Sequence, residues 1–244
     1  GGNPVSAFDS APGEYDRWFA ANANVFESEL RLLLHFLSMR PVGRALSVGC
    51  GSGLFEEALR ARGVAIGECV EPSAMGEIAA RRGLRVLRGR AEELPFGDGE
   101  FDTVLLNGVL DYVDDPRRAL SEARRVLRPG GWVIVADVVA EGSYGLLYEL
   151  ASVRGWEPLR RVSPPNPYPL EFLRSARWRT VEELTGLLTG AGFSDLEYAQ
   201  TLTRHPRYSN AAPEDPIPGY DRGDYVAIRG IRADRRGPGG VGTG

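Results

Sequence analysis

Apolar residues recur at two alternating spacings from residue 45 onward. Short apolar runs, typical of buried strands, are separated by segments in which apolar residues recur every three or four positions, as in helices. One helical segment has Asp115 as its N-cap, Pro116 at its first position and Gly130 at its end. Strands that alternate with helices predict parallel strands in a covered α/β sheet. The five apolar runs lie at residues 45–48, 65–70, 85–87, 101–106 and 132–138.

Two segments beside this alternating region have other patterns. Residues 14–38 have the apolar spacing of a helix, which predicts an N-terminal cap helix within residues 1–38, ahead of a core at 39–141. Residues 142–179 break the alternation and contain six aromatic side chains together with a cluster of prolines. This composition indicates a lid or an insertion over the core.

The end of the chain divides into two parts. Residues 180–232 return to the alternating pattern and are expected to complete the same α/β domain, with strands near 196–202 and 225–231. Residues 233–244 are rich in glycine and arginine, and this composition predicts a disordered tail.

Composition and charge narrow the classes of function. The chain has 244 residues, of which 43% are hydrophobic and 25% charged, as is ordinary for a globular protein. The net charge of −4 gives no general basic surface for nucleic acid. All 29 basic residues are arginine, which excludes mechanisms that need a lysine, such as a Schiff base or a P-loop. No apolar run has the length of a membrane span and no signal peptide is recognised, so a cytoplasmic enzyme without a membrane partner is expected.

The two cysteines are expected to be structural. Cys50 lies in a glycine-rich loop, and Cys69 falls in an apolar run that predicts strand core. Two cysteines do not suggest a disulfide framework. No histidine is close to Cys50 in the sequence, so we do not expect this residue to be a nucleophile.

A nucleotide-like ligand is indicated where the first strand meets the next helix. The sequence from Gly49 to Gly53 has three glycines, which let the backbone turn sharply and approach a ligand without a Cβ clash. Glu71 ends the second strand, 18 residues after Gly53, where a carboxylate can accept hydrogen bonds from a ribose diol. These two features also fit a nicotinamide dehydrogenase.

Two further motifs favour another family. Residues 91–96 (Ala-Glu-Glu-Leu-Pro-Phe) precede the fourth strand, and residues 125–131 (Arg-Val-Leu-Arg-Pro-Gly-Gly) precede the fifth. With the glycine loop and Glu71, this order resembles the class I S-adenosylmethionine-dependent methyltransferases over residues 44–138. Neither of these two motifs is explained if the chain is a nicotinamide dehydrogenase. The flanking residues 14–19, 180–192 and 200–206 resemble a branch of small bacterial methyltransferases, of the UbiE type and similar to histamine N-methyltransferases.

The resemblance implies a Rossmann-like α/β fold with seven mostly parallel strands, helices on both faces and the last strand antiparallel. S-adenosylmethionine would bind across the carboxyl ends of the first strands, and no metal is implied. The glycines would lie along its methionine part, Glu71 would hold the ribose, and Ala91 and Glu92 would frame the adenine. The residues assigned to the cofactor are Tyr15, Gly49, Cys50, Gly51, Gly53, Glu71, Pro72, Ala91, Glu92 and Asn107.

Three positions depart from the family pattern. Ser47 stands where many members have an acid that helps hold the cofactor amino group, and Arg90 stands where an aspartate often meets the adenine. Asp111 and Tyr112 stand where many members have histidine. At the first two of these positions, each lost charged hydrogen bond would weaken cofactor binding by roughly 1.5–3 kcal/mol unless other groups compensate.

The function predicted from the sequence is in-line methyl transfer to a small-molecule acceptor. Asp111 and His205 are the candidates to orient or deprotonate the acceptor, since both follow strands that end at the same rim. Tyr112 and Tyr144 are candidates to line its pocket. The alternative is a non-catalytic cofactor-binding or partner-binding protein that kept the fold. Nucleic-acid methylation is not expected, because Asn107 is not followed by the Pro-Pro-aromatic sequence of DNA amino-methylating enzymes.

Overall fold

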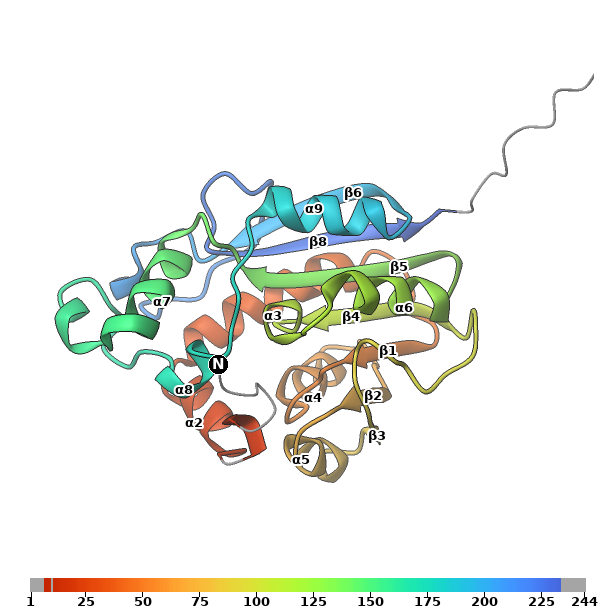
Figure 1. The fold of residues 1–244 in the computed structure, drawn as a ribbon, viewed down its shortest axis with the longest axis horizontal. Coiled ribbons are helices and arrows are strands. Elements are labelled where there is room, and N and C mark those ends of the chain that lie inside the picture. Colours follow the sequence, from red (N-terminus) through yellow and green to blue (C-terminus); the bar gives the residue numbers. More distant parts are fainter. Residues whose placement is uncertain (1–6, 10, 234–244) are drawn as a thin grey trace, which may run out of the picture.

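An eight-stranded sheet is the centre of the molecule (Figure 1). The computed structural model describes residues 7–9 and 11–233. The strand order is β3-β2-β1-β4-β5-β8-β6-β7. The strands are β1 (Ala45–Val48), β2 (Glu68–Glu71), β3 (Arg85–Arg88), β4 (Phe101–Asn107), β5 (Leu127–Val138), β6 (Phe193–Thr201), β7 (Ile217–Pro218) and β8 (Tyr225–Arg232).

The predicted α/β fold with a mostly parallel sheet is confirmed. Strands β1 to β5 pair in parallel, and β8 runs antiparallel between β5 and β6. The expected number of seven strands is wrong, because the chain between β6 and β8 returns to the sheet edge. There Ile217 and Pro218 pair with Gln200 and Ala199 as the short strand β7.

Helices pack against both faces of the sheet. One apolar layer joins β4 and β5 to the apolar side of α3, and the other joins them to α6 and α9. Neighbouring residues of β4 and β5 enter opposite layers, since side chains alternate along a strand. The helices are α2 (Glu14–Ala21), α3 (Ala23–Leu37), α4 (Leu54–Ala61), α5 (Met75–Arg81), α6 (Pro116–Val126), α7 (Ser143–Arg154), α8 (Leu170–Leu173) and α9 (Val181–Gly190).

The segment expected to be one cap helix contains two helices, α2 and α3. They meet at Asn22, whose φ of −124° and ψ of 52° lie outside the helical region. The buried Asn22 side chain donates to the Trp18 carbonyl oxygen at 2.9 Å. An asparagine side chain can satisfy backbone groups locally, so it stabilises the break that apolar spacing alone did not reveal.

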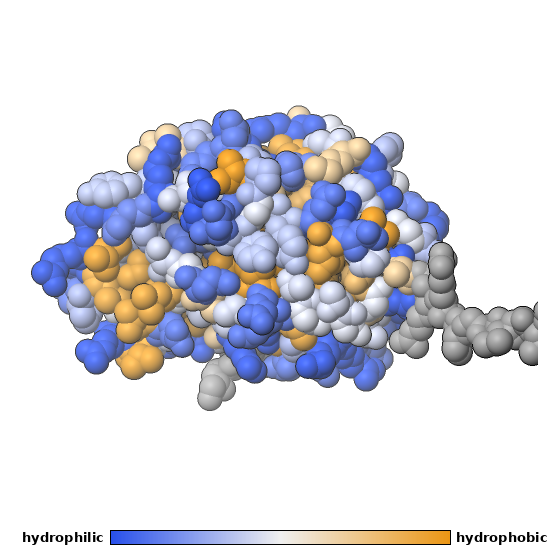
Figure 2. Space-filling model, turned by 90° about the horizontal axis from the view of Figure 1, so that it is seen from above, coloured by the Kyte–Doolittle hydropathy of each residue, from blue (hydrophilic) through white to orange (hydrophobic). Residues whose placement is uncertain are grey.

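Helix α7 explains why residues 142–179 had no helical pattern. Its inner side chains, such as Tyr148, are buried, while Leu146, Leu150 and Val153 on the other side are exposed. A helix with apolar residues on both sides has no amphipathic stripe. Figure 2 shows an apolar patch at the end of the molecule where α7 lies.

A disulfide joins Cys50 to Cys69, which the number of cysteines in the sequence did not suggest. Cys50 follows β1, and Cys69 lies on the neighbouring parallel strand β2. Their Cα atoms are 6.0 Å apart, within the usual range for a disulfide. The strand pairing that brings them together is not visible in the cysteine spacing.

The carboxyl ends of the parallel strands face α2, α7 and α8, which gather at one end of the sheet (Figure 1). Within residues 7–9 and 11–233, no helix is long and apolar enough to span a membrane. The expected tail at 233–244 lies outside the described residues, apart from Ala233.

Candidate active site

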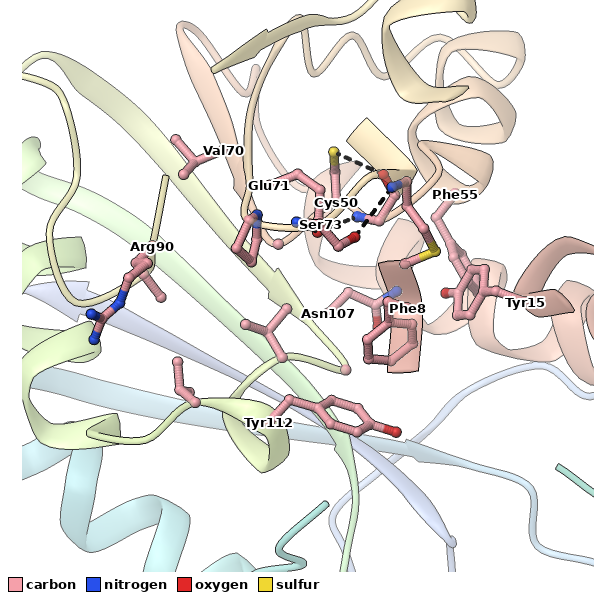
Figure 3. Close-up of a pocket in the computed structure, with 18 of the residues that line it drawn as sticks. Phe8, Tyr15, Cys50, Phe55, Val70, Glu71, Ser73, Arg90, Asn107 and Tyr112 are labelled. Carbon is pink, nitrogen blue, oxygen red and sulfur yellow. Dashed lines mark hydrogen bonds between the residues drawn. The ribbon is translucent and has the colours of Figure 1, made fainter. Parts of the chain in front are cut away.

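The first cavity opens at the carboxyl ends of β1, β2 and β4 and has a volume of about 290 Å³ (Figure 3). Nine of the ten residues that the sequence assigned to the cofactor line it. The exception is Gly53, where a Cβ atom would lie 2.5 Å from the Leu84 side chain and 3.1 Å from Ala79. Gly53, with φ of +75°, therefore serves the close packing of the loop on α5.

The glycine loop and Glu71 hold each other in place. Gly49 and Gly51 have φ values of +74° and +58°, a region that favours glycine. The Gly51 N–H donates to Glu71 Oε1 at 2.9 Å, and the Ser73 N–H donates to Glu71 Oε2 at 2.8 Å (Figure 3). Each oxygen keeps a lone pair for a further donor, so the carboxylate can still accept from a ribose diol. Burial raises the pKa of Glu71, and the Ser73 and Gly51 hydrogen bonds oppose this shift.

Glu56 supplies a carboxylate that the sequence analysis missed. Ser47, at the position where an acid was expected, donates its hydroxyl to Glu56 Oε1 at 2.8 Å. Glu56 belongs to α4 and lines the first cavity, and its buried Oε2 atom has no partner among the described residues. Burial raises the pKa of Glu56 to about 7. An orphaned buried carboxylate oxygen fits the ammonium group of S-adenosylmethionine.

A neighbouring carboxylate also compensates for Arg90, which stands where many family members have an aspartate. Arg90 and Glu92 both line the first cavity, and the Arg90 guanidinium donates to Glu92 Oε2 at 3.2 Å. Arg90 is 65% exposed, whereas Glu92 is 8% exposed. The arginine charge therefore points toward solvent and is paired, while the cavity wall beside Ala91 keeps its carboxylate.

A second cavity, of about 80 Å³, adjoins the first. Six residues line both: Tyr15, Phe55, Asn107, Gly108, Tyr112 and Tyr168. The candidate residues Asp111 and Tyr144 also line the second cavity. Much of its wall comes from α2 and from residues 142–179, so both segments reach the carboxyl ends of the strands.

Buried carboxyl groups surround this second cavity. Burial raises the pKa of Asp111, and burial together with nearby Asp111 raises the pKa of Asp137 well above its ordinary value. Each of these two carboxyls affects the proton affinity of the other, although both Asp137 oxygens and Asp111 Oδ1 have no hydrogen-bond partner among the described residues. Burial also raises the pKa of Glu29 to about 8, and the Tyr225 hydroxyl offsets only part of this shift. Tyr225 donates to Asn107 Oδ1 at 2.5 Å, which connects β8 to the junction of the cavities.

The structure does not bring His205 to either cavity. His205 is exposed, precedes the short 3₁₀ helix Pro206–Tyr208, and accepts the Arg207 N–H on Nδ1 at 3.1 Å. His205 is connected to the second cavity only indirectly. Ser209 follows the same 3₁₀ helix, and its hydroxyl is hydrogen-bonded to the hydroxyl of Tyr144, which lines that cavity. Sequence reasoning also missed Glu29 and Asp137, since only the folded chain brings them beside Asp111. No group of three or more metal-ligating side chains is placed to hold a metal within the described residues.

Comparisons with known proteins agree with this geometry. The family model described as "Methyltransferase domain" matches residues 46–135. A solved structure from Thermotoga maritima, described as a SAM-dependent methyltransferase and possible histamine N-methyltransferase, is 36% identical with a TM-score of 0.80. The match covers 94% of this chain and 99% of that one.

Two curated relatives extend the comparison. The malonyl-[acyl-carrier protein] O-methyltransferase of Serratia marcescens is 31% identical, over 79% of this chain and 72% of that protein. The demethylmenaquinone methyltransferase of Beutenbergia cavernae is 30% identical, over 69% of this chain and 72% of that protein. The chain belongs to the S-adenosylmethionine-dependent methyltransferases. This assignment overturns the nicotinamide dehydrogenase alternative.

Proposed function

We propose that the protein transfers a methyl group from S-adenosylmethionine to a small-molecule acceptor held in the second cavity. One observation carries this proposal: six residues line both cavities, so a donor in one and an acceptor in the other meet at Tyr15 and Asn107. The relatives are named for chemically different acceptors, so their names do not identify the acceptor of this chain.

Different residues of the first cavity would contact different parts of the cofactor. Glu71 would accept from the ribose hydroxyls, Glu56 would pair with the ammonium group, and Ala91 and Glu92 would frame the adenine. The bound cofactor supplies a methyl group already activated by the sulfonium sulfur. Tyr15 would cover the methionine part from α2.

The protein itself contributes alignment and the exclusion of water. Two aromatic side chains, Tyr15 from α2 and Tyr168 from residues 142–179, line both cavities where they meet. Holding two reactants in line can lower a barrier by roughly 7–11 kcal/mol. No covalent intermediate on the chain is needed, which agrees with the disulfide-bonded state of Cys50.

An acceptor screen with methyl-labelled S-adenosylmethionine tests the proposal. Amines, thiols, phenols and small acids are the classes to compare, and we expect label to enter one of them. Binding of S-adenosylhomocysteine without turnover of any class would instead support the non-catalytic alternative.

We expect cofactor affinity to depend on Glu56 and pH. In the free protein Glu56 holds its proton up to about pH 7, whereas an ammonium ion beside it would favour the carboxylate. Affinity for S-adenosylhomocysteine should therefore rise about tenfold from pH 6 to pH 8, with proton release on binding near pH 6. Calorimetry in buffers of different ionisation enthalpy measures both quantities.

The matched variants separate this carboxylate from its neighbours. Glu56→Gln should remove the proton release and the pH dependence, while Glu57→Gln, an exposed change on the same helix, should keep both. A pH dependence that survives in Glu56→Gln would contradict the assignment.

The raised pKa of Glu56 also makes the stability of the ligand-free protein depend on pH. Between about pH 4.5 and 7 the folded state keeps a proton that the unfolded state releases, so the free energy of unfolding falls as the pH rises through this range.

A further inference from the structure

Four carboxyl groups from different elements line the second cavity. Glu29 comes from α3, Asp111 from the 3₁₀ helix Leu110–Tyr112, Asp137 from β5, and Asp224 from the residue before β8. No arginine or histidine is among the described residues that line this cavity. All four carboxyls are in residues that are less than one-tenth exposed. Such a concentration of buried acid is costly unless a partner compensates it.

Among the described residues, the aspartates at the strand ends have no hydrogen-bonded cationic partner. Both Asp137 oxygens and Asp111 Oδ1 are buried without a hydrogen-bond donor among the described residues. Asp224 differs, because its Oδ1 accepts the Ser143 N–H at 2.6 Å at the start of α7. Arg179 acts on both strand-end aspartates electrostatically, yet its Nη1 donates to the Leu110 carbonyl oxygen at 2.8 Å. Asp111 and Asp137 therefore present free acceptor atoms to the cavity.

Aromatic rings form most of the remaining wall. Ten of the 19 lining residues are aromatic. The rings of Trp18 and Tyr168 lie 5.0 Å apart, and those of Tyr148 and Trp178 lie 5.3 Å apart. Faces of tryptophan and tyrosine attract cations through their quadrupoles. Carboxyls and aromatic faces in one small cavity are complementary to an organic cation.

We propose that the second cavity binds the methyl acceptor as a small amine in its protonated form, with Asp111 and Asp137 as its counter-charge. This inference rests on the proposed function, which places the acceptor in that cavity. A volume of about 80 Å³ is about half of a cavity that holds benzene, so the amine is small. An anionic acceptor would be repelled, and a neutral alcohol would leave the carboxyl charge uncompensated.

Asp111 and Asp137 also lie where the protonated amine would have to release a proton before methyl transfer. Asp137 follows Ala136, which pairs with Asn107 at the junction of the cavities. The ammonium would give one proton to the Asp111–Asp137 pair, which frees the nitrogen lone pair. The nitrogen lone pair forms the new N–C bond while the C–S bond of the donor breaks and the electrons of that bond remain on sulfur. Charge and atoms balance, because the positive charge of the sulfonium passes to the methylated nitrogen, the sulfur becomes a neutral thioether, and the released proton stays on the carboxyl pair.

Three probes of similar size, one cationic, one neutral and one anionic, test the inference on the wild-type full chain saturated with S-adenosylhomocysteine. The probes are ethylamine, ethanol and acetate, and their binding is followed by calorimetry and by the fluorescence of Trp18 and Trp178. We expect ethylamine to bind at least tenfold more tightly than ethanol, and acetate most weakly. Equal affinity for the amine and the alcohol, or preference for acetate, would overturn the inference.

Variants then assign the effect to the carboxyl pair. Asp111→Asn with Asp137→Asn should reduce ethylamine affinity at least tenfold and leave ethanol and S-adenosylhomocysteine affinities within twofold of wild type. Glu149→Gln, an exposed change on α7, is the matched control and should change none of them. Amine affinity unchanged in the folded double variant would exclude these aspartates as the counter-charge. Failure to bind S-adenosylhomocysteine in the same titrations would count against the proposed function, which makes the two failures distinguishable.

Discussion

Glu71→Ala is expected to weaken S-adenosylhomocysteine binding by roughly 10- to 150-fold, or 1.5–3 kcal/mol. The carboxylate is buried and accepts two backbone N–H groups, from Gly51 and Ser73, so it has one position relative to the loop. Its loss would remove the acceptor for the ribose and leave these N–H groups without their partner. Calorimetry on wild type and variant measures the change.

Glu68→Ala is the control for this prediction, because Glu68 lies on the same strand β2 but lines neither cavity. It pairs with Arg44 on the surface at 2.9 Å, and such pairs contribute at most about 1 kcal/mol. Unchanged affinity in Glu71→Ala would show that the ribose is held elsewhere.

Loss of the Cys50–Cys69 disulfide is expected to lower the free energy of unfolding by about 3 kcal/mol. The bridge closes a loop with a sequence separation of 19, and cross-linking such a loop restricts the unfolded chain. For a chain of this size, the melting temperature should fall by roughly 6–12 °C. Thermal and denaturant unfolding with and without a reductant measure both quantities.

The double variant with Cys50→Ser and Cys69→Ser provides the reference. It should unfold like the reduced wild type and should not respond to reductant. Equal unfolding of the wild type under oxidising and reducing conditions would mean that the two sulfurs are not bonded in solution. Since Cys50 also lines the first cavity, cofactor affinity should be measured in the same samples.

Local sequence patterns predicted the features that depend on local chemistry. The order of strands and helices follows from apolar spacing, and the helix start at Asp115 is confirmed, since its side chain accepts the Arg118 N–H. The glycine loop and Glu71 also lie together as predicted. In each case, residues close in sequence, or one strand pairing, determine the geometry.

Features that depend on distant segments could not be predicted in this way. Glu56 compensates for Ser47 only because α4 turns back over the end of β1. Glu29, Asp111 and Asp137 are separated by up to 108 positions and meet only when α3, β4 and β5 are packed together. His205 shows the opposite case: it follows the sixth strand as expected, yet the chain turns into a 3₁₀ helix and keeps the side chain outside both cavities.

The place of β8 in the sheet also determines when the molecule can be completed during synthesis. This strand, at 225–232, pairs with both β5 and β6, which are made earlier. Until it leaves the ribosome, β5 and β6 have unpaired edges, which are sites for incorrect association. Tyr225, which holds Asn107 at the cavity junction, arrives with the same strand. The glycine loop can therefore assemble on the nascent chain before β8 is made, whereas the acceptor side of the site forms only after β8 has left the ribosome.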